Sequence, residues 1–374
     1  MYHKKVVPLQ AFTNRKYGKK VNTTHRLKIF YTIATLLLSA VVYAQNESKP
    51  ILNTLRFETR FDYDYQSFEN DSEPILGGFS GKYINVAMAG NITDRFSYNY
   101  RQRILPNKGL SSLFDGTDWI YLTYDITNNL SISGGKQVFQ IGGFEYDMPP
   151  IDVYFWSDFW NNIICYQMGA SLTYTDDSKN HNITFQFANS NYTYEPLENL
   201  YAYNLIWFGN FEHFKTIYSV NMVEYSKGKY INYIALGNKL VLDNFSCYID
   251  LMNRATNKQD KFFGEDYTVI GKMEWKPNKQ WNLFAKGGYD ANNTQTMDEN
   301  GNPIVVSPHE YLDIFVTPGT EYHYYGVGAE YFPLKDNKDI RLHTFVAVKN
   351  DGSNELHFNM GLTWRVNFMK YIKL

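Results

Sequence analysis

Cysteine is nearly absent from this chain, which contains only Cys165 and Cys247 among 374 residues. The two lie far apart on segments that we predict to be strands, with their side chains on opposite faces, so we expect no disulfide between them. Such a chain must obtain its rigidity from hydrogen bonds and packing.

Long apolar runs are also scarce, and the mean hydropathy of −0.43 argues against a bundle of membrane-spanning helices. The exception is residues 29–42, which follow Arg26 and Lys28. As a helix this run would rise only about 21 Å, short of a hydrocarbon core of about 30 Å. The pattern predicts a signal peptide that is cleaved after Ala44, with an uncleaved signal anchor as the alternative. We therefore divide the chain into a cleaved signal-peptide region, residues 1–44, and an outer-membrane β-barrel, residues 45–374.

Basic charge is in short supply once that leader is removed. Eight of the 36 Lys and Arg residues lie in the first 44 positions, which contain no Asp or Glu. The remaining chain has 28 basic and 38 acidic residues, a net charge of about −10. This balance argues against a nucleic-acid partner.

Aromatic residues are abundant instead, at 17% of the chain, with 32 Tyr, 26 Phe and 7 Trp. Tyr and Trp suit a membrane interface because the ring is apolar and its tip is polar. High aromatic content and low hydropathy are compatible in an outer-membrane β-barrel, where alternate residues face lipid and a watery lumen.

Two long segments alternate between apolar and polar residues. At positions 55–65 the odd positions are aromatic, aliphatic or Thr and the even positions are charged, and positions 356–368 repeat the pattern over thirteen residues. That length exceeds most soluble strands. Fourteen similar stretches lie between them, which predicts about sixteen strands. They occur near Phe79, Phe96, Trp119, Leu130, Ile164, Ile183, Tyr201, Phe214, Tyr230, Phe245, Tyr267, Trp281, Tyr322 and Ile340.

The connections between these stretches alternate in length, and the short ones carry turn residues. Short periplasmic turns and long outer loops are typical of outer-membrane barrels. We therefore predict an all-β fold, a transmembrane antiparallel up-and-down β-barrel of about 16 strands. Three connections depart from the rule: residues 226–229 and 350–354 are short for outer loops, and residues 333–339 are long for a turn.

One long connection, residues 140–162, has an unusual composition for a surface loop. It contains seven aromatic residues, which would be unfavourable to expose, and four carboxylates. We interpret it as a constriction loop that folds into the lumen. The alternative is packing at the rim or at a subunit contact. The carboxylates at the narrowest point would then be Glu145, Asp147, Asp152 and Asp158.

A family resemblance is carried by Gly135-Lys136-Gln137, at the end of a predicted strand, and by Gly142-Gly143-Phe144-Glu145. This pattern resembles the phosphate-selective porin O and P family, and its Bacteroidetes branch in particular. The resemblance implies a sixteen-stranded barrel, commonly a trimer, through which small anions or other small solutes diffuse. In motif it covers residues 135–162, and in architecture it covers the mature chain.

Anion selectivity would require Arg and Lys side chains along the lumen wall. Acidic residues share the lumen-facing parity of the first strand with arginines, so we expect a mixed polar lining in which charges pair with one another. The pore-lining candidates are Arg56, Glu58, Arg60, Asp62, Arg101, Arg103 and Lys136.

Near the C-terminus, residues 359–366 read NMGLTWRV, which resembles the signal recognised by the barrel-assembly machinery. A terminal aromatic residue is usual in that signal, whereas this chain ends in Leu374. The expected partners are therefore this machinery, outer-membrane lipid and lipopolysaccharide, small solutes or ions, and further copies of the chain in a homotrimer.

Together these patterns predict an outer-membrane porin of a Gram-negative bacterium, a passive diffusion channel for small hydrophilic solutes or ions, with phosphate among the candidate anions. We expect no catalytic residue, no metal and no cofactor. Two alternatives stay open, an outer-membrane enzyme and a secreted β-sandwich binding protein. The enzyme is disfavoured because the eight histidines are scattered and none forms a recognisable catalytic set.

Overall fold

The computed structural model describes residues 51–69, 75–104, 113–193, 199–256, 261–292, 320–335, 337–350 and 353–371. The predicted leader and its cleavage site after Ala44 lie outside these ranges, so cleavage stays a prediction.

Sixteen strands account for most of the described residues. They are long, because alternating side chains favour an extended backbone with two different faces. Their bounds are β1 (Thr54–Phe68), β2 (Leu76–Asn91), β3 (Phe96–Arg103), β4 (Thr117–Asp125), β5 (Leu130–Val138), β6 (Tyr166–Thr175), β7 (His181–Asn189), β8 (Tyr201–Asn210), β9 (Phe214–Ser226), β10 (Lys229–Val241), β11 (Phe245–Thr256), β12 (Asp266–Asn278), β13 (Trp281–Asn292), β14 (Thr320–Tyr331), β15 (Ile340–Asn350) and β16 (Asn354–Asn367).

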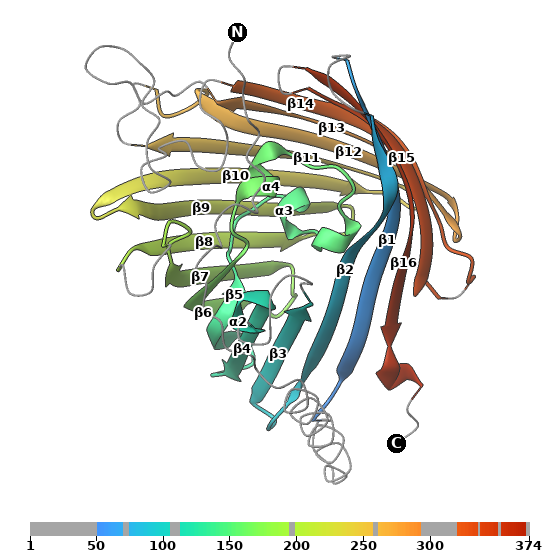
Figure 1. Ribbon diagram of the computed structural model, residues 1–374. Helices are drawn as coiled ribbons and strands as arrows, with labels where there is room; N and C mark the ends of the chain where they lie inside the picture. Colours follow the sequence, from blue (N-terminus) through green and yellow to red (C-terminus); the bar gives the residue numbers. More distant parts are fainter. Residues whose placement is uncertain are drawn as a thin grey trace, which may run out of the picture. The chain divides into compact units, whose positions relative to one another are not determined.

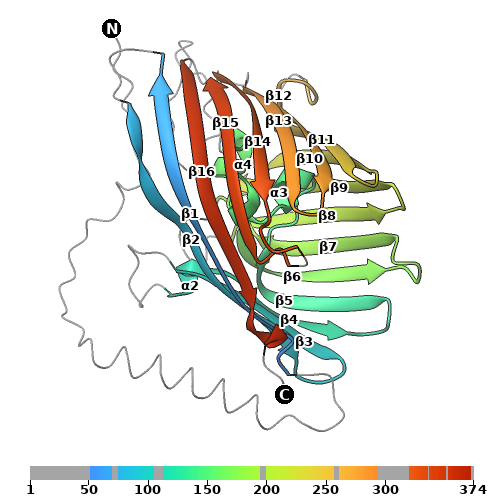
Figure 2. The same ribbon diagram turned by 90° about the vertical axis from the view of Figure 1, so that its right-hand side faces the viewer.

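Each strand pairs with its neighbours in sequence, and β1 also pairs with β16. All sixteen pairings are antiparallel, so the sheet closes into a barrel, whose curved wall is visible in Figure 1 and, from the side, in Figure 2. Closure confirms the predicted up-and-down barrel and rules out the β-sandwich alternative. It also gives the edge strands β1 and β16 a hydrogen-bonding partner.

The two ends of the barrel differ in their connections. At one end, which we call the turn end, short connections join β2 to β3, β4 to β5, β6 to β7, β8 to β9, β10 to β11 and β12 to β13. The opposite end, the loop end, carries most of the longer connections. Gly209-Asn210 and Pro277-Asn278 contain residue types that are common in turns, but they are the last residues of β8 and β12. The connection between β9 and β10 is short, as the sequence predicted. It consists of Lys227 and Gly228, and Gly228 adopts a left-handed φ of 73°.

The two faces of the barrel follow the alternation in sequence. On β8, Ala202, Asn204 and Ile206 are buried inside, whereas Leu205 is 49% exposed on the outer face. Near the turn end, three exposed tryptophans belong to an outer aromatic band, as expected at the boundary between lipid and water. These are Trp275, Trp281 and Trp364.

The helices are short: α2 (Leu113–Gly116), α3 (Phe144–Asp147), α4 (Asp158–Asn162), and the 3-10 turns η2 (Pro150–Asp152) and η3 (Phe368–Lys370). No helix within the described ranges has the length and apolar character needed to cross a membrane.

A charged residue at the middle of the outer face should destabilise the barrel. We expect Leu205→Lys to lower the free energy of unfolding by about 2–4 kcal/mol, because lysine must be desolvated where lipid chains pack. The measurement is urea unfolding of barrels folded into lipid vesicles. Leu205→Met is the matched control, and equal stability of the two variants would contradict the assignment of this face to lipid.

Candidate functional site

The connection between β5 and β6 lies inside the barrel, where Figure 1 shows α3 and α4 within the curve of the sheet. We call residues 139–165 the inward segment. Two glycines let it leave β5 and run along the wall. A Cβ atom on Gly142 would lie 2.8 Å from the carbonyl oxygen of Ile217, and Gly143 has a left-handed φ of 103°. The N–H of Gly142 donates to Ser219 Oγ at 2.8 Å.

Three aromatic residues of the loop, Tyr154, Phe155 and Phe159, are buried against the inner wall, where they belong to two clusters. Tyr154 and Phe155 pack with Phe284, Tyr324 and Phe345 of β13, β14 and β15. On the opposite side, rings from both ends of the segment pack against β8 to β11. This second cluster includes Phe139, Phe159, Ile163, Tyr225 and Tyr233. The other four rings, those of Phe144, Tyr146, Trp156 and Trp160, are half-buried. Full or partial burial inside the barrel explains why the sequence can hold seven aromatic residues in one connection.

Asp250 of β11 holds the start of α3. Its two carboxylate oxygens accept the backbone N–H groups of Phe144 at 2.9 Å and of Glu145 at 2.8 Å. These N–H groups at a helix start have no partner within the helix, so the carboxylate satisfies them. Asp250 therefore fixes where the segment touches the wall.

Glu145 is buried at 1% exposure, and it is neutralised by the wall rather than presented to a path. Its carboxylate forms an ion pair with Lys286 of β13. The same carboxylate accepts the Ser157 hydroxyl at 2.6 Å and the Tyr324 hydroxyl at 3.2 Å. Lys286 also donates to the carbonyl of Phe155 at 2.5 Å. Lys286 thus joins two points of the segment, Glu145 and Phe155, to the wall.

Asp152 is the second neutralised carboxylate. Arg341 of β15 and Arg365 of β16 each approach it at 2.7 Å. Although burial would raise the pKa of Asp152, the two guanidinium groups hold it below the ordinary value. This carboxylate therefore stays ionised and attached to the wall across the physiological pH range.

The other two predicted carboxylates have different surroundings. Asp147 is exposed to solvent, and desolvation by the surrounding protein atoms raises its pKa above the ordinary value, an effect opposed by Lys239 of β10. Asp158 is half-buried, and its backbone N–H donates to Asp290 of β13 at 3.0 Å. The four candidates thus do not form one ring of carboxylates.

The predicted wall residues of β1 and β3 are on the lumen face and carry ion pairs. Arg56 contacts Glu58 at 2.9 Å, and Arg60 contacts Asp62 at 2.6 Å. On β3, a carboxylate of β4 pairs with two guanidinium groups. Asp118 lies 3.1 Å from Arg101 and 3.1 Å from Arg103.

Lys136 does not line the lumen, and this prediction was wrong. The register pairs it with Ile120 of β4 and Met168 of β6, both exposed on the outer face. Directly paired residues point to the same side of a sheet, so Lys136 starts on the outer face. Its ammonium donates to the carbonyl of Phe114 at 3.1 Å. The next residue of β5, Gln137, faces the lumen instead. Its side-chain oxygen accepts a hydrogen bond from the buried hydroxyl of Ser171.

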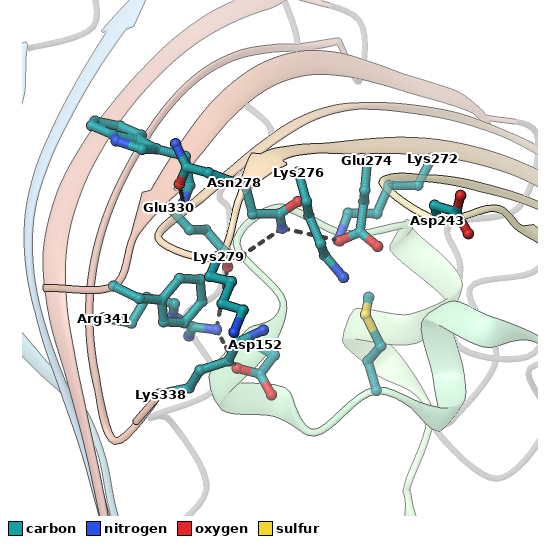
Figure 3. A pocket seen from close by; sticks show the side chains of 14 residues that line it. Asp152, Asp243, Lys272, Glu274, Lys276, Asn278, Lys279, Glu330, Lys338 and Arg341 are labelled. Carbon is teal, nitrogen blue, oxygen red and sulfur yellow. Dashed lines mark hydrogen bonds and ion pairs between the residues drawn. The ribbon is translucent and has the colours of Figure 1, made fainter. Parts of the chain in front are cut away.

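A cavity of about 530 Å³ lies between the inward segment and the turn end (Figure 3). Its carboxylates are mostly paired. Asp152 and Glu330 both contact Arg341, and Glu274 contacts Lys272 at 2.8 Å. Asp243 is exposed at the margin of the cavity.

Three further lysines line this cavity: Lys276 of β12, Lys279 in the next turn and Lys338 before β15. Figure 3 shows Lys276 and Lys279 extending toward the open space. Within the described ranges, none of the three forms an ion pair with a carboxylate. Sequence reasoning missed all three. Lys276 could have been predicted, because the even-numbered residues of β12 face the lumen. Lys338 could not, because only the curvature of the closed sheet brings it to the same cavity.

Residues 55–207 match the model of a family described as phosphate-selective porin O and P. The match includes both motifs that carried the predicted resemblance, which is thereby confirmed. No curated protein matches the chain.

Solved structures of outer-membrane proteins are similar in fold. The anion-selective porin from Comamonas acidovorans is 9% identical with a TM-score of 0.57, covering 84% of this chain and 99% of that one. The outer membrane channel DcaP of Acinetobacter baumannii is 12% identical with a TM-score of 0.58, covering 83% and 96%. OmpT of Vibrio cholerae, in trimer form, is 11% identical with a TM-score of 0.53, covering 84% and 99%.

Removing one partner of the Glu145–Lys286 ion pair should loosen the inward segment. We expect Lys286→Met to cost about 3–5 kcal/mol, because it leaves a buried carboxylate without its cation. The double variant Lys286→Met, Glu145→Gln should recover part of this loss. Guanidinium unfolding of the two variants and of the parent measures the difference. Equal effects of the single and double variants would show that the pair does not carry the anchoring.

Proposed function

We propose that this outer-membrane β-barrel channel, which is similar to the phosphate-selective porin O and P family over residues 55–207, prefers small anions. Small hydrophilic solutes would diffuse through its lumen, and the inward segment would narrow their path. We further propose that the loop end faces the outside of the cell and the turn end faces the periplasm, the usual orientation of such barrels.

One observation carries the anion preference. The carboxylates of the inward segment that approach the wall, Glu145 and Asp152, are neutralised by Lys286, Arg341 and Arg365. The cavity toward the turn end then retains three lysines without a carboxylate partner in the described part of the chain. The cavity lining has five basic side chains (Lys272, Lys276, Lys279, Lys338 and Arg341) and four carboxylates (Asp152, Asp243, Glu274 and Glu330), so a passing solute meets a net charge of +1.

The acidic balance of the whole chain does not oppose this proposal. At physiological salt the Debye length is about 8 Å, so exposed charges farther than this from the cavity are largely screened from it. Inside a narrow lumen with walls of low dielectric constant, nearby charges act more strongly. The local excess of Lys276, Lys279 and Lys338 should therefore decide selectivity.

Phosphate is a reasonable member of the solute class. Lysine ammonium groups bind phosphate oxygens as point charges, and three of them line one cavity of about 530 Å³. Because most carboxylates of the cavity are paired with basic side chains, little uncompensated negative charge would repel an anion. We propose inorganic phosphate as the first solute to test.

We propose that no covalent chemistry takes place. The polar groups of the inward segment are engaged in anchoring contacts, such as those of Glu145 with Ser157 and Tyr324. Such fixed contacts support a scaffold rather than an acid or base poised for a substrate. An outer-membrane enzyme would hydrolyse lipid or peptide and conduct no ions.

The assembly is also proposed as a homotrimer, supported by the trimer form of OmpT among the similar structures. The exposed outer face with residues such as Leu205 and Trp364 supports a surrounding of lipid and lipopolysaccharide. Recognition by the barrel-assembly machinery is proposed from residues 359–366, most of the last strand, β16.

The channel proposal is tested by conductance of the purified protein in a planar lipid bilayer. We expect discrete steps and, in a salt gradient, a reversal potential with the sign of anion preference. Phosphate should reduce the chloride current by occupying the cavity. Absence of discrete steps would refute the channel.

Substituting Lys276, Lys279 and Lys338 together by Gln should reduce the anion-to-cation permeability ratio by about two-fold or more, because the local positive potential falls. Reversal potentials before and after substitution give the ratio. The control is Lys229→Gln, an exposed lysine at the start of β10 and at the other end of the barrel. A cavity variant that keeps the parental ratio would contradict a role for these lysines.

Selectivity should also depend on pH through Asp147. Because its pKa is raised above the ordinary 3.8, this carboxylate takes up a proton at a higher pH than an ordinary Asp would. Lowering the pH from about 7 to about 4 therefore protonates Asp147 to a greater extent than an ordinary Asp and should increase anion preference. Asp152, whose pKa is lowered, is protonated to a smaller extent than an ordinary Asp over the same range. Reversal potentials measured across this range should change less in Asp147→Asn, and an identical pH response would count against this residue.

A further inference from the structure

The seam where the first and last strands meet is the place at which the barrel closes. Register there runs from Arg56 opposite Asn367 to Phe68 opposite Glu355. The two strands are far apart in sequence, so closing the seam carries the largest loss of chain entropy of any strand pairing in the barrel. Any contact that bridges the seam from inside therefore matters for closure.

The inward segment makes such contacts at the turn η2. From β1, Arg60 donates to the carbonyl of Ile151 at 3.3 Å and to that of Val153 at 3.1 Å. From β16, Arg365 forms its ion pair with Asp152 at 2.7 Å. Both strands of the seam thus hold the same short piece of chain.

The neighbouring strand extends this set of contacts. Arg341 of β15 binds Asp152 at 2.7 Å, and it also donates to the carbonyl of Ile151 at 3.3 Å. Its second nitrogen donates to Thr363 of β16 at 3.1 Å. The side chains of Arg60 and Arg341 are sheltered from water at 3% and 8% exposure, whereas those of Asp152 and Arg365 are partly exposed, at 21% and 25%.

We infer that residues 150–153 form a closure clip, which holds β1 and β16 together from inside the barrel. Arg60 and Arg365 can reach the clip at the same time only when the seam is closed. Docking of the inward segment and closure of the barrel are therefore one cooperative event. An open seam releases the segment, and a detached segment weakens the seam.

The inference rests on the fold and does not depend on solute transport. Once one strand of the seam has bound residues 150–153, the contact with the other strand forms within the same molecule. It therefore forms at a high effective concentration. Low dielectric surroundings strengthen the charged contacts. The remaining partners of the guanidinium groups, Glu58 for Arg365 and Glu330 for Arg341, stay in place when Asp152 is changed. An Asp152→Asn variant should therefore fold.

The experiment measures the temperature at which the folded barrel opens in detergent, seen as the shift in electrophoretic mobility after heating. We expect Asp152→Asn to lower this temperature by about 5 °C, because the charged contacts of Asp152 with Arg341 of β15 and Arg365 of β16 are lost. The matched control is Asp147→Asn, which changes an exposed carboxylate of the same segment. Because the pKa of Asp147 is raised, its ionised form does not stabilise the folded state, and the control should open at or above the parental temperature.

A cross-link distinguishes the seam from general stabilisation. Phe61 and Leu362 are directly paired across β1 and β16 and both are exposed on the outer face. Paired residues in antiparallel strands have the Cα separation that a disulfide needs, about 4.5–5.5 Å. With Cys165 and Cys247 replaced by Ser, Phe61→Cys and Leu362→Cys should form a disulfide that holds the seam shut.

In the oxidised cross-linked barrel the effect of Asp152→Asn should disappear, and a reducing agent should restore it. The inference is overturned if Asp152→Asn opens at the same temperature as Asp147→Asn. It is also overturned if the loss persists at full size in the cross-linked barrel, since the clip would then act elsewhere. Neither readout requires ion conduction, so failure of the channel proposal and failure of the clip are separate results.

Discussion

Inside a hydrocarbon layer, each backbone N–H or C=O without a partner is unfavourable by several kcal/mol, and strands can avoid this only in a closed ladder. Closure of β1 onto β16 meets that requirement and leaves no free edge. It also encloses a lumen wider than the side chains of the wall can fill. The inward segment occupies part of this space, so its position follows from the same closure that satisfies the backbone.

A lumen wall has to be polar because it faces water, and this determines how a segment can bind to it. The aromatic rings of the segment supply apolar burial, for example Phe155 against Phe345. Orientation comes from polar anchors: Asp250 on the start of α3, Lys286 on Glu145 and Arg341 on Asp152. Buried charges are favourable only when paired with good geometry, so these anchors allow few alternative positions.

The same pairing redistributes charge along the lumen. Two of the four carboxylates of the segment, Glu145 and Asp152, form ion pairs that attach it to the wall. On the turn-end side, Lys276, Lys279 and Lys338 form no ion pair with a carboxylate in the described part of the chain. A chain with a net negative charge can thus present a positive cavity, because the location of each charge, rather than the total, sets the local potential.

The sequence alone determined the barrel, its strand number and the faces of its strands, because alternation with period two is a local property that lipid and water impose on every strand. It also marked residues 140–162 as exceptional, since seven aromatic residues in one connection need a place to be buried. The prediction that Lys136 lines the lumen was wrong, because alternation along β5 places its side chain on the same face as Ile120, which is exposed outside.

Only the tertiary structure decided which charges meet. Asp152 and Arg365 are separated by more than half of the barrel in sequence, and Lys276 and Lys338 share a cavity only after the sheet has curved and closed. Such contacts depend on long-range geometry, which no local pattern of residues encodes.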